Sequence, residues 1–188
     1  MKRTWSPDEL AAHWVLTDPE RQLLPDRVDH NRLGFAVHLK FFELEVRFPE
    51  SPRDIPAAAL NALATQLQIP STTLARYDWH GRARKHHRAQ IRAWFGFRPF
   101  TSTDGQALKA WLHQEVLPWT SPLQPLEDTG RDGCHEHPLE PPTTGRLRRL
   151  VRSAVQTYEH AFFDMIARRL TPATHQRLDA LLQPAGAE

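Results

Sequence analysis

Helix start signals recur along this chain and restrict the folds that are open to it. Ser6 is followed by Pro7 and Glu9, so the hydroxyl and the carboxylate can each bond a backbone amide in the first turn of a helix. Thr17 and Glu20 repeat the same capping box. No stretch alternates strictly between apolar and polar residues, as a half-buried strand would. The sequence therefore predicts an all-α fold.

Apolar periodicity and prolines divide the chain into segments. Residues 48–56 hold three prolines in nine positions, which predicts a loop. Gly34 lies inside an apolar periodic segment and indicates close packing against a neighbouring helix. Thr103 and Gln106 predict the start of another helix. Helices are expected to start after Ser6 and after Thr17, and to cover 26–48, 56–69, 71–77, 104–117, 146–170 and 171–182.

Composition predicts three parts in this 188-residue chain. An N-terminal helical domain over 1–117 is followed at 118–145 by six prolines and three glycines in 28 residues, which predicts an irregular linker. A C-terminal helical pair is expected over 146–188. The single cysteine, Cys134, is typical of a reducing compartment, and no apolar run approaches the roughly 20 residues that span a bilayer. We expect a cytoplasmic protein.

Residues 57–76 fit a helix-turn-helix of the kind that reads DNA. Ala64 is the small residue at the helix crossing, Ile69 lies in the turn, and Leu74 anchors the second helix. Gln68 and Pro70 depart from the usual glycine and serine of the turn. A helical hairpin with no role in DNA binding fits the same pattern. The outward face would offer hydroxyls and a guanidinium to base edges and phosphates, from Ser71, Thr72, Thr73 and Arg76.

Positive charge gathers at 76–100, although the whole chain has a formal charge of only +2. This stretch holds seven Lys or Arg residues and one acid, and no further acid follows Asp78 until Asp104. Such cations repel one another unless a polyanion arrives, and a phosphate backbone is one such partner. A solvated basic helix, an acidic protein surface or a membrane surface are the alternatives. Helical spacing predicts a buried side that consists of Ala83, His87, Ile91, Trp94 and Phe95. It predicts an adjacent side, presented to a partner, that consists of Arg84, Lys85, Arg88 and Arg92.

Catalytic motifs and metal-ligand spacings are missing from the sequence. It contains no glycine-rich phosphate loop, no nucleophile elbow and no HExxH motif. The run "CHEH" at 134–137 places its ligands consecutively, which does not suit a tetrahedral zinc site. We therefore expect a non-enzymatic protein with no cofactor and no metal. A smaller basic cluster lies at the start of the segment 146–170 and contains Arg146, Arg148, Arg149 and Arg152. These arginines either are simply exposed or bind an anion at the start of the helix, and the sequence favours neither interpretation.

Three motifs together resemble a known family. They are "NRLGFA" at 31–36, the "FPxSPxDIP" loop at 48–56, and the "HxRxxIRxxxGFRPF" block at 86–100. The chain resembles the N-terminal region of the large replicative transposases of class II transposons, the Tn-three family, over 4–116 and again over about 141–183. Residues 118–140 depart from the family pattern, which has a helix there that is rich in leucine and basic residues.

The resemblance implies a helical region that recognises the terminal inverted repeats of a transposon, whereas the acidic triad that binds metal and cuts DNA lies far downstream. We expect sequence-specific binding of duplex DNA in support of transposition, near the bacterial nucleoid. The alternative is a protein-interaction module that pairs with a full-length transposase through the apolar face of 146–170. The predicted DNA-binding residues are Ser71, Thr72, Thr73 and Arg76 for base or groove contacts; Arg82, Arg84, Lys85, Arg88 and Arg92 for phosphates; Trp79 for the sugar–phosphate edge; and His87 and Arg98 as further contacts.

Overall fold

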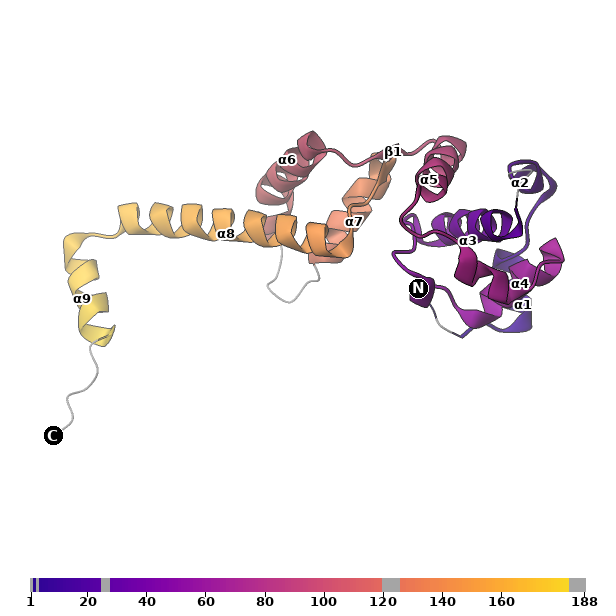
Figure 1. Cartoon of the computed structure of the whole chain (residues 1–188). Helices are drawn as coiled ribbons and strands as arrows, with labels where there is room; N and C mark the ends of the chain where they lie inside the picture. Colours follow the sequence, from indigo (N-terminus) through magenta and orange to yellow (C-terminus); the bar gives the residue numbers. More distant parts are fainter. Residues whose placement is uncertain (1, 3, 25–27, 120–125, 183–188) are drawn as a thin grey trace. The chain divides into compact units, whose positions relative to one another are not determined.

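The computed structural model describes residues 2, 4–24, 28–119 and 126–182, and it confirms the all-α fold (Figure 1). Among these residues the only strands are the two-residue strands β1 (Arg98–Pro99) and β2 (Leu139–Glu140), which pair in parallel. The α-helices are α1 (Pro7–His13), α2 (Asp18–Gln22), α3 (Asp29–Glu45), α4 (Ala57–Leu67), α5 (Arg82–Phe95), α6 (Ser102–Trp111), α7 (Leu126–Glu136), α8 (Thr144–Arg169) and α9 (Pro172–Leu182). Short segments of 3₁₀ or π geometry complete the list: η1 (Pro52–Asp54), η2 (Ser71–Arg76), η3 (Leu112–Val116) and η4 (Leu117–Trp119).

The chain forms two compact units that do not follow the boundaries expected from composition. Unit 1 consists of residues 1–100 together with the later segment 132–142, and unit 2 consists of residues 101–131 and 143–188. The return of 132–142 depends on the pairing of β2 with β1. Composition predicted 1–117, 118–145 and 146–188 instead, because it carries no information on such long-range pairing.

The expectation of an irregular linker over 118–145 is wrong for residues 126–136, which form helix α7. The prolines of this stretch cluster on either side, and the run from Leu126 to His137 contains none. A proline-free run can therefore complete its backbone hydrogen bonds, although the average composition of the whole stretch is unfavourable. Pro122 and Pro125 lie outside the described residues.

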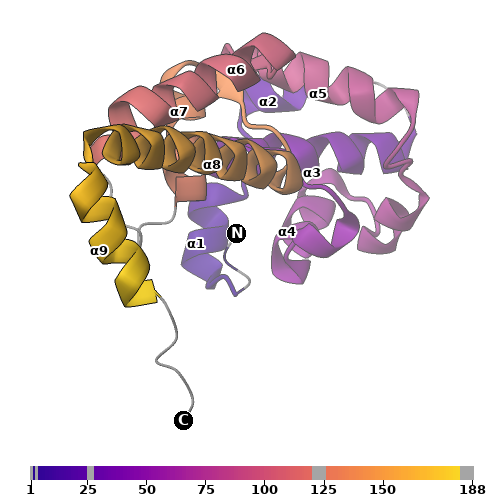
Figure 2. The same ribbon diagram turned by 90° about the vertical axis from the view of Figure 1, so that its left-hand side faces the viewer.

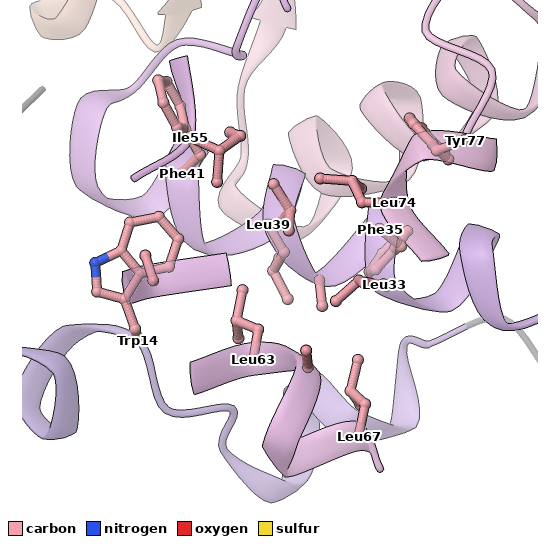
Figure 3. Packing of buried hydrophobic residues seen from close by; sticks show 14 of the residues in the cluster. Trp14, Leu33, Phe35, Leu39, Phe41, Ile55, Leu63, Leu67, Leu74 and Tyr77 are labelled. Carbon is pink, nitrogen blue, oxygen red and sulfur yellow. The ribbon is translucent and has the colours of Figure 1, made fainter. Parts of the chain in front are cut away.

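The core of unit 1 surrounds α3. Every residue from Leu33 to Phe42 is buried, so this helix is covered on all sides rather than along one stripe. Helices α4 and α5 and the turn η2 all contact it. Figure 3 shows Leu33, Phe35 and Leu39 of α3 among side chains of the surrounding elements.

Capping boxes start α1 and α2, as the sequence predicted. Ser6 with Glu9 and Thr17 with Glu20 each make both reciprocal bonds. A further box is formed by Thr101 and Asp104, two residues before the start that was expected at Thr103. Asp104 completes the same reciprocal geometry there as a glutamate does elsewhere.

The box at Thr17 also supports a buried ion pair. Glu20 is buried, and its Oε1 accepts a hydrogen bond from Lys40 Nζ of α3 at 3.1 Å. Glu43 contacts the same ammonium group. The charge of Lys40 is thus neutralised inside the core, which a buried lysine requires.

Gly34 is a point of close approach in unit 1. A methyl group at this position would overlap the ring of Tyr77, which lies directly on the glycine. The expectation of close packing at Gly34 is confirmed, although its neighbour is an aromatic ring from the segment after η2 rather than a second helix. This contact places Tyr77 against α3 at the base of α5.

Unit 2 is built around the first half of α8. Leu147, Val151 and Ala154 are buried, and this part of the helix packs against α6 and the 112–116 turn (Figure 2). From Gln156 onward nearly all side chains of α8 are exposed. Within the described part of the chain, no helix combines the length and the apolar character needed to cross a membrane.

Candidate nucleic-acid interface

The 57–76 segment has the predicted anchors but not the predicted second helix. Ala64, Ile69 and Leu74 are buried, and Gln68 adopts the left-handed conformation usually given to glycine, with φ 58°. The second element, η2, is a 3₁₀ helix of only six residues. A helix-turn-helix with a regular recognition helix is therefore not confirmed. Of the four predicted contact residues on η2, Thr72 and Arg76 are exposed, and Ser71 and Thr73 are half-buried.

Helix α5 follows directly and is bounded by two glycines. Gly81 precedes the helix, and a side chain there would overlap the carboxylate of Asp78, whose Oδ1 accepts a hydrogen bond from His80 N at 2.9 Å. Gly96 ends the helix in the left-handed region, with φ 73°, which glycine adopts at no steric cost. The basic helix that the sequence predicted to begin near Gly81 is thus present, and it has 14 residues.

The inward side of α5 carries His87, Ile91 and Phe95, as predicted. His87 lies against the ring of Phe35 and stacks on Tyr77, with centroids 5.7 Å apart. The hydroxyl of Tyr77 and Nδ1 of His87 are hydrogen-bonded at 3.0 Å. Trp94 was expected on this side too, but 46 % of it is exposed.

A buried histidine of α3 supports the base of α5. Nδ1 of His38 donates to the carbonyl oxygen of Gly34 at 2.7 Å, which leaves Nε2 to accept from Nε of Arg84 at 3.4 Å. Burial lowers the pKa of His38 to about 3, and the nearby positive charge of Arg84 acts in the same direction. The neutral ring is therefore held in one tautomer between a carbonyl group and a guanidinium group.

Arg84 points into unit 1 rather than toward solvent. Its guanidinium donates to the carbonyl oxygen of Pro49 at 2.7 Å and to that of Trp79 at 3.0 Å. Burial lowers the pKa of Arg84 from its ordinary value. These contacts join the proline loop, the segment before α5 and helix α3. The side chain thus holds the scaffold of α5 in place.

Arg88 and Arg92 share one carboxylate from a distant part of the chain. Arg92 Nη1 donates to Oε2 of Glu140 at 2.6 Å, and Arg88 bonds Oε1 of the same group. The side chain of Glu140 is only 7 % exposed, whereas those of Arg88 and Arg92 are 31 % and 17 % exposed. The expectation that this stripe has no acidic partner is wrong for these two arginines, because strand β2 brings Glu140 beside α5.

The outward side of α5 differs from the predicted one. Within the residues that the structure describes, neither Arg82 nor Lys85 has a carboxylate within ion-pair distance. Arg76 of the preceding turn is exposed as well. The exposed positions on α5 are Arg82, Lys85, His86, Ala89, Gln90, Ala93 and Trp94. We call Arg82, Lys85, His86, Ala89, Gln90 and Ala93 the outward face of α5.

Three further predicted contact residues lie away from this face. Trp79 is 9 % exposed and packs with His38 and Tyr77, so its ring is not presented to a sugar–phosphate edge. His87 is buried. Arg98 is exposed in β1, where its backbone amide donates to the carbonyl oxygen of Pro138 at 3.1 Å. Sequence reasoning missed His38 and Glu140, because neither has a local signal.

The second basic cluster is partly engaged inside unit 2. Nε of Arg148 donates to Oε1 of Glu127 at 2.9 Å, and Arg146 contacts the carbonyl oxygen of Thr101 at 3.3 Å. Arg149 and Arg152 are exposed. In the described part of the chain, no three side chains of the metal-binding types gather at one place, and the thiol of Cys134 is buried.

Comparison with known proteins shows that this chain is similar in sequence to transposases. The transposase of transposon Tn21 from Escherichia coli is 26% identical over 183 residues, which cover 95% of this chain and 18% of that protein. The transposase of transposon Tn3926 from Escherichia coli is 23% identical over 177 residues, or 94% of this chain and 18% of that protein. For the transposase of transposon Tn1546 from Enterococcus faecium the identity is 24% over 160 residues, or 83% of this chain and 16% of that protein.

The chain therefore spans less than a fifth of the length of these relatives. The matches confirm the resemblance to Tn-three-family transposases that the three motifs indicated. A family model described as a domain of unknown function, DUF4158, matches residues 1–154. Because this match covers most of its length, the chain belongs to the DUF4158 family.

Proposed function

We propose that this protein binds duplex DNA sequence-specifically at the terminal inverted repeats of a transposon and so supports transposition. Its relatives are named as transposases, which links the chain to DNA transposition. The observation that carries the proposal is the outward face of α5, where Arg82 and Lys85 point to solvent without an acidic partner among the described residues. Each phosphate that they neutralise releases condensed counterions, which favours binding.

The predicted contact residues divide into two groups under this proposal. Arg82 and Lys85 contact phosphates of the DNA directly. Arg76 and Thr72 contact the sugar–phosphate backbone of the DNA where it passes η2. Arg88 remains partly exposed, so it adds to the local positive potential although it also bonds Glu140. The other predicted residues lie away from the outward face of α5 and would hold it in position rather than contact phosphates: Ser71, Thr73, Trp79, Arg84, His87, Arg92 and Arg98.

The cutting of DNA belongs elsewhere under this proposal. The chain matches at most 18% of the length of the transposases named above. Its charged face offers cations and hydrogen-bond donors, which position a nucleic acid but do not hold a catalytic metal ion. We therefore propose a binding role in which a separate nuclease region performs the strand transfer.

A binding titration tests the proposal. The purified protein is titrated by fluorescence anisotropy against a duplex that carries its transposon end and against a scrambled duplex, at two salt concentrations. The double variant Arg82→Ala/Lys85→Ala should bind both duplexes more weakly, and the slope of log K against log salt should fall by about two. Arg177→Ala removes one exposed arginine from α9 and is the control. Equal effects of the two substitutions would contradict the proposal.

A second candidate function rests on α8. Tyr158, Phe162 and Met165 continue the stripe of Leu147 and Val151 at helical spacing, but they are exposed or half-exposed where the earlier residues are buried. An apolar stripe of this kind is typical of a helix that packs against a partner. In this alternative, the chain pairs with a full-length transposase through α8 and regulates it.

Co-elution distinguishes the two candidates. If the chain shifts the elution volume of a full-length transposase but does not bind duplex DNA, the second candidate is favoured. The variant Phe162→Ser/Met165→Ser should then abolish the shift. Because both side chains are exposed, their replacement leaves the buried part of α8 unchanged.

A further inference from the structure

The outward face of α5 combines long polar side chains with small ones. Arg82, His86 and Gln90 follow one another at four-residue intervals, so they lie one above the other on the same side of the helix. Ala89 and Ala93 lie between and beside them. All five residues are exposed. Between the long side chains, only methyl groups protrude at Ala89 and Ala93.

The two alanines matter for how closely a duplex can approach. An exposed helical surface is usually covered by long charged side chains, which hold a partner away from the helix axis. At Ala89 and Ala93 only methyl groups protrude. A helix inserted in the major groove needs such clearance, and the alanine methyl can also contact the methyl group of thymine.

The dimensions of α5 favour it over η2 as the element that enters a groove. At about 1.5 Å per residue, its 14 residues extend for roughly 21 Å. The six residues of η2 extend for only about 12 Å at 2.0 Å per residue, and two of its four predicted contact residues are half-buried. The major groove is about 12 Å wide and admits an α-helix.

We infer that α5 is the element that reads base edges in the major groove, and that Gln90 and His86 of its outward face determine the sequence preference. This inference rests on the proposed function, and it assigns base recognition to a different element from the one that the sequence pattern indicated. Arg82 and Lys85 contact the phosphates beside the groove. Because Arg84 and Glu140 hold the inward side of α5, the outward face is presented on a fixed support.

The chemistry of Gln90 points to adenine. A glutamine amide has a carbonyl acceptor and an NH₂ donor in one plane, which matches N6 and N7 of adenine in the major groove. His86 offers one ring nitrogen as donor and the other as acceptor when it is neutral. The arrangement therefore predicts an adenine in the recognised sequence, next to the base pair that His86 contacts.

Selection from a random pool tests the inference. The full chain is incubated with a pool of duplexes that contain a randomised segment of about two helical turns, and the bound sequences are determined. The same selection is made with Gln90→Ala, His86→Ala and Thr73→Ala, and with Gln156→Ala of α8 as the matched control. Alanine is the best helix former, so the substitutions at exposed helical positions keep the fold.

The expected result is that Gln90→Ala and His86→Ala each lose a preference of about tenfold or more at one or two positions of the selected sequence. Thr73→Ala and Gln156→Ala should select the same sequence as the unaltered protein. If the preference is lost with Thr73→Ala but kept with Gln90→Ala, η2 reads the bases and the inference is wrong. If the unaltered protein binds the pool without any preference, the inference is wrong and so is sequence-specific binding, and only general binding of DNA stands. If it does not bind duplexes at all, the proposed function itself fails.

Discussion

Arg92 donates a hydrogen bond at 2.6 Å to Glu140, a residue 48 positions later in the sequence. The pair joins the basic helix α5 to the segment that returns to unit 1 through β2. Arg88 bonds the other oxygen of the same carboxylate. One buried acid thus neutralises part of a stripe that carries no acid of its own.

Replacing Glu140 by glutamine should destabilise unit 1. The substitution keeps the shape but removes the charge, so the partly buried guanidinium groups of Arg88 and Arg92 lose their counter-charge. We expect the free energy of unfolding to fall by about 1–3 kcal/mol, measured by urea denaturation. The control Asp128→Asn breaks an exposed ion pair with Arg131 and should change it by less than about 0.5 kcal/mol. An unchanged free energy for Glu140→Gln would show that the shared carboxylate does not contribute to stability.

A methyl group at Gly34 should also destabilise the protein. Gly34→Ala would overlap the ring of Tyr77, which is confined between α3 and α5, so the ring must shift or the helices must separate. Overpacking of this kind costs about 1–3 kcal/mol. The control is Gly145→Ala, where an added Cβ meets no atom within 4 Å. Thermal denaturation of both variants measures the difference, and a Gly34→Ala variant as stable as the control contradicts the packing described above.

Stability should depend on pH through His38. Burial holds its pKa at about 3, below the ordinary 6.5, so the unfolded chain binds one more proton than the folded chain between these values. The free energy of unfolding therefore rises with pH in this window, by about 1.4 kcal/mol per pH unit from this group, and the contribution is lost as pH falls below 6.5. His38→Gln removes the titrating group, so the slope between pH 4 and pH 6 should become shallower by about that amount.

The groups that face His38 are Arg84, His87 and Arg88, and they remain in the variant. His86→Gln removes an exposed histidine of α5 and is the control substitution. The comparison is made by urea denaturation at each pH. Equal slopes for the unaltered protein and His38→Gln would mean that His38 is not kept neutral by burial.

Two arginines on α5 should respond differently to the same conservative change. The guanidinium of Arg84 bonds the carbonyl oxygens of Pro49 and Trp79 at once, which the single ammonium group of lysine cannot reproduce. Arg84→Lys should therefore lower the free energy of unfolding by about 1–3 kcal/mol. Arg82→Lys, two positions earlier on the exposed side, should have no measurable effect on thermal denaturation. A similar loss in both variants would contradict the scaffold role of Arg84.

Local features of the fold could be predicted from the sequence because each depends on residues a few positions apart. The capping boxes at Ser6 and Thr17 are of this kind. The small residue Gly34 indicated a close approach, but its partner Tyr77 lies far along the chain and had no local signal. Helix α7 escaped prediction because proline content was averaged over 28 residues rather than read run by run.

The sequence by itself determined that this chain forms helices, where several of them begin, and that α5 is strongly basic. Only the tertiary structure decided which of those cations face solvent. Helical spacing groups Arg84, Arg88 and Arg92 on one stripe, but their orientation depends on Pro49 and Glu140, which lie 35 and 52 positions away from Arg84 and Arg88 respectively. A contact at that separation forms only when the chain returns through the pairing of β1 with β2 and the folding of the proline loop, and no local pattern records it.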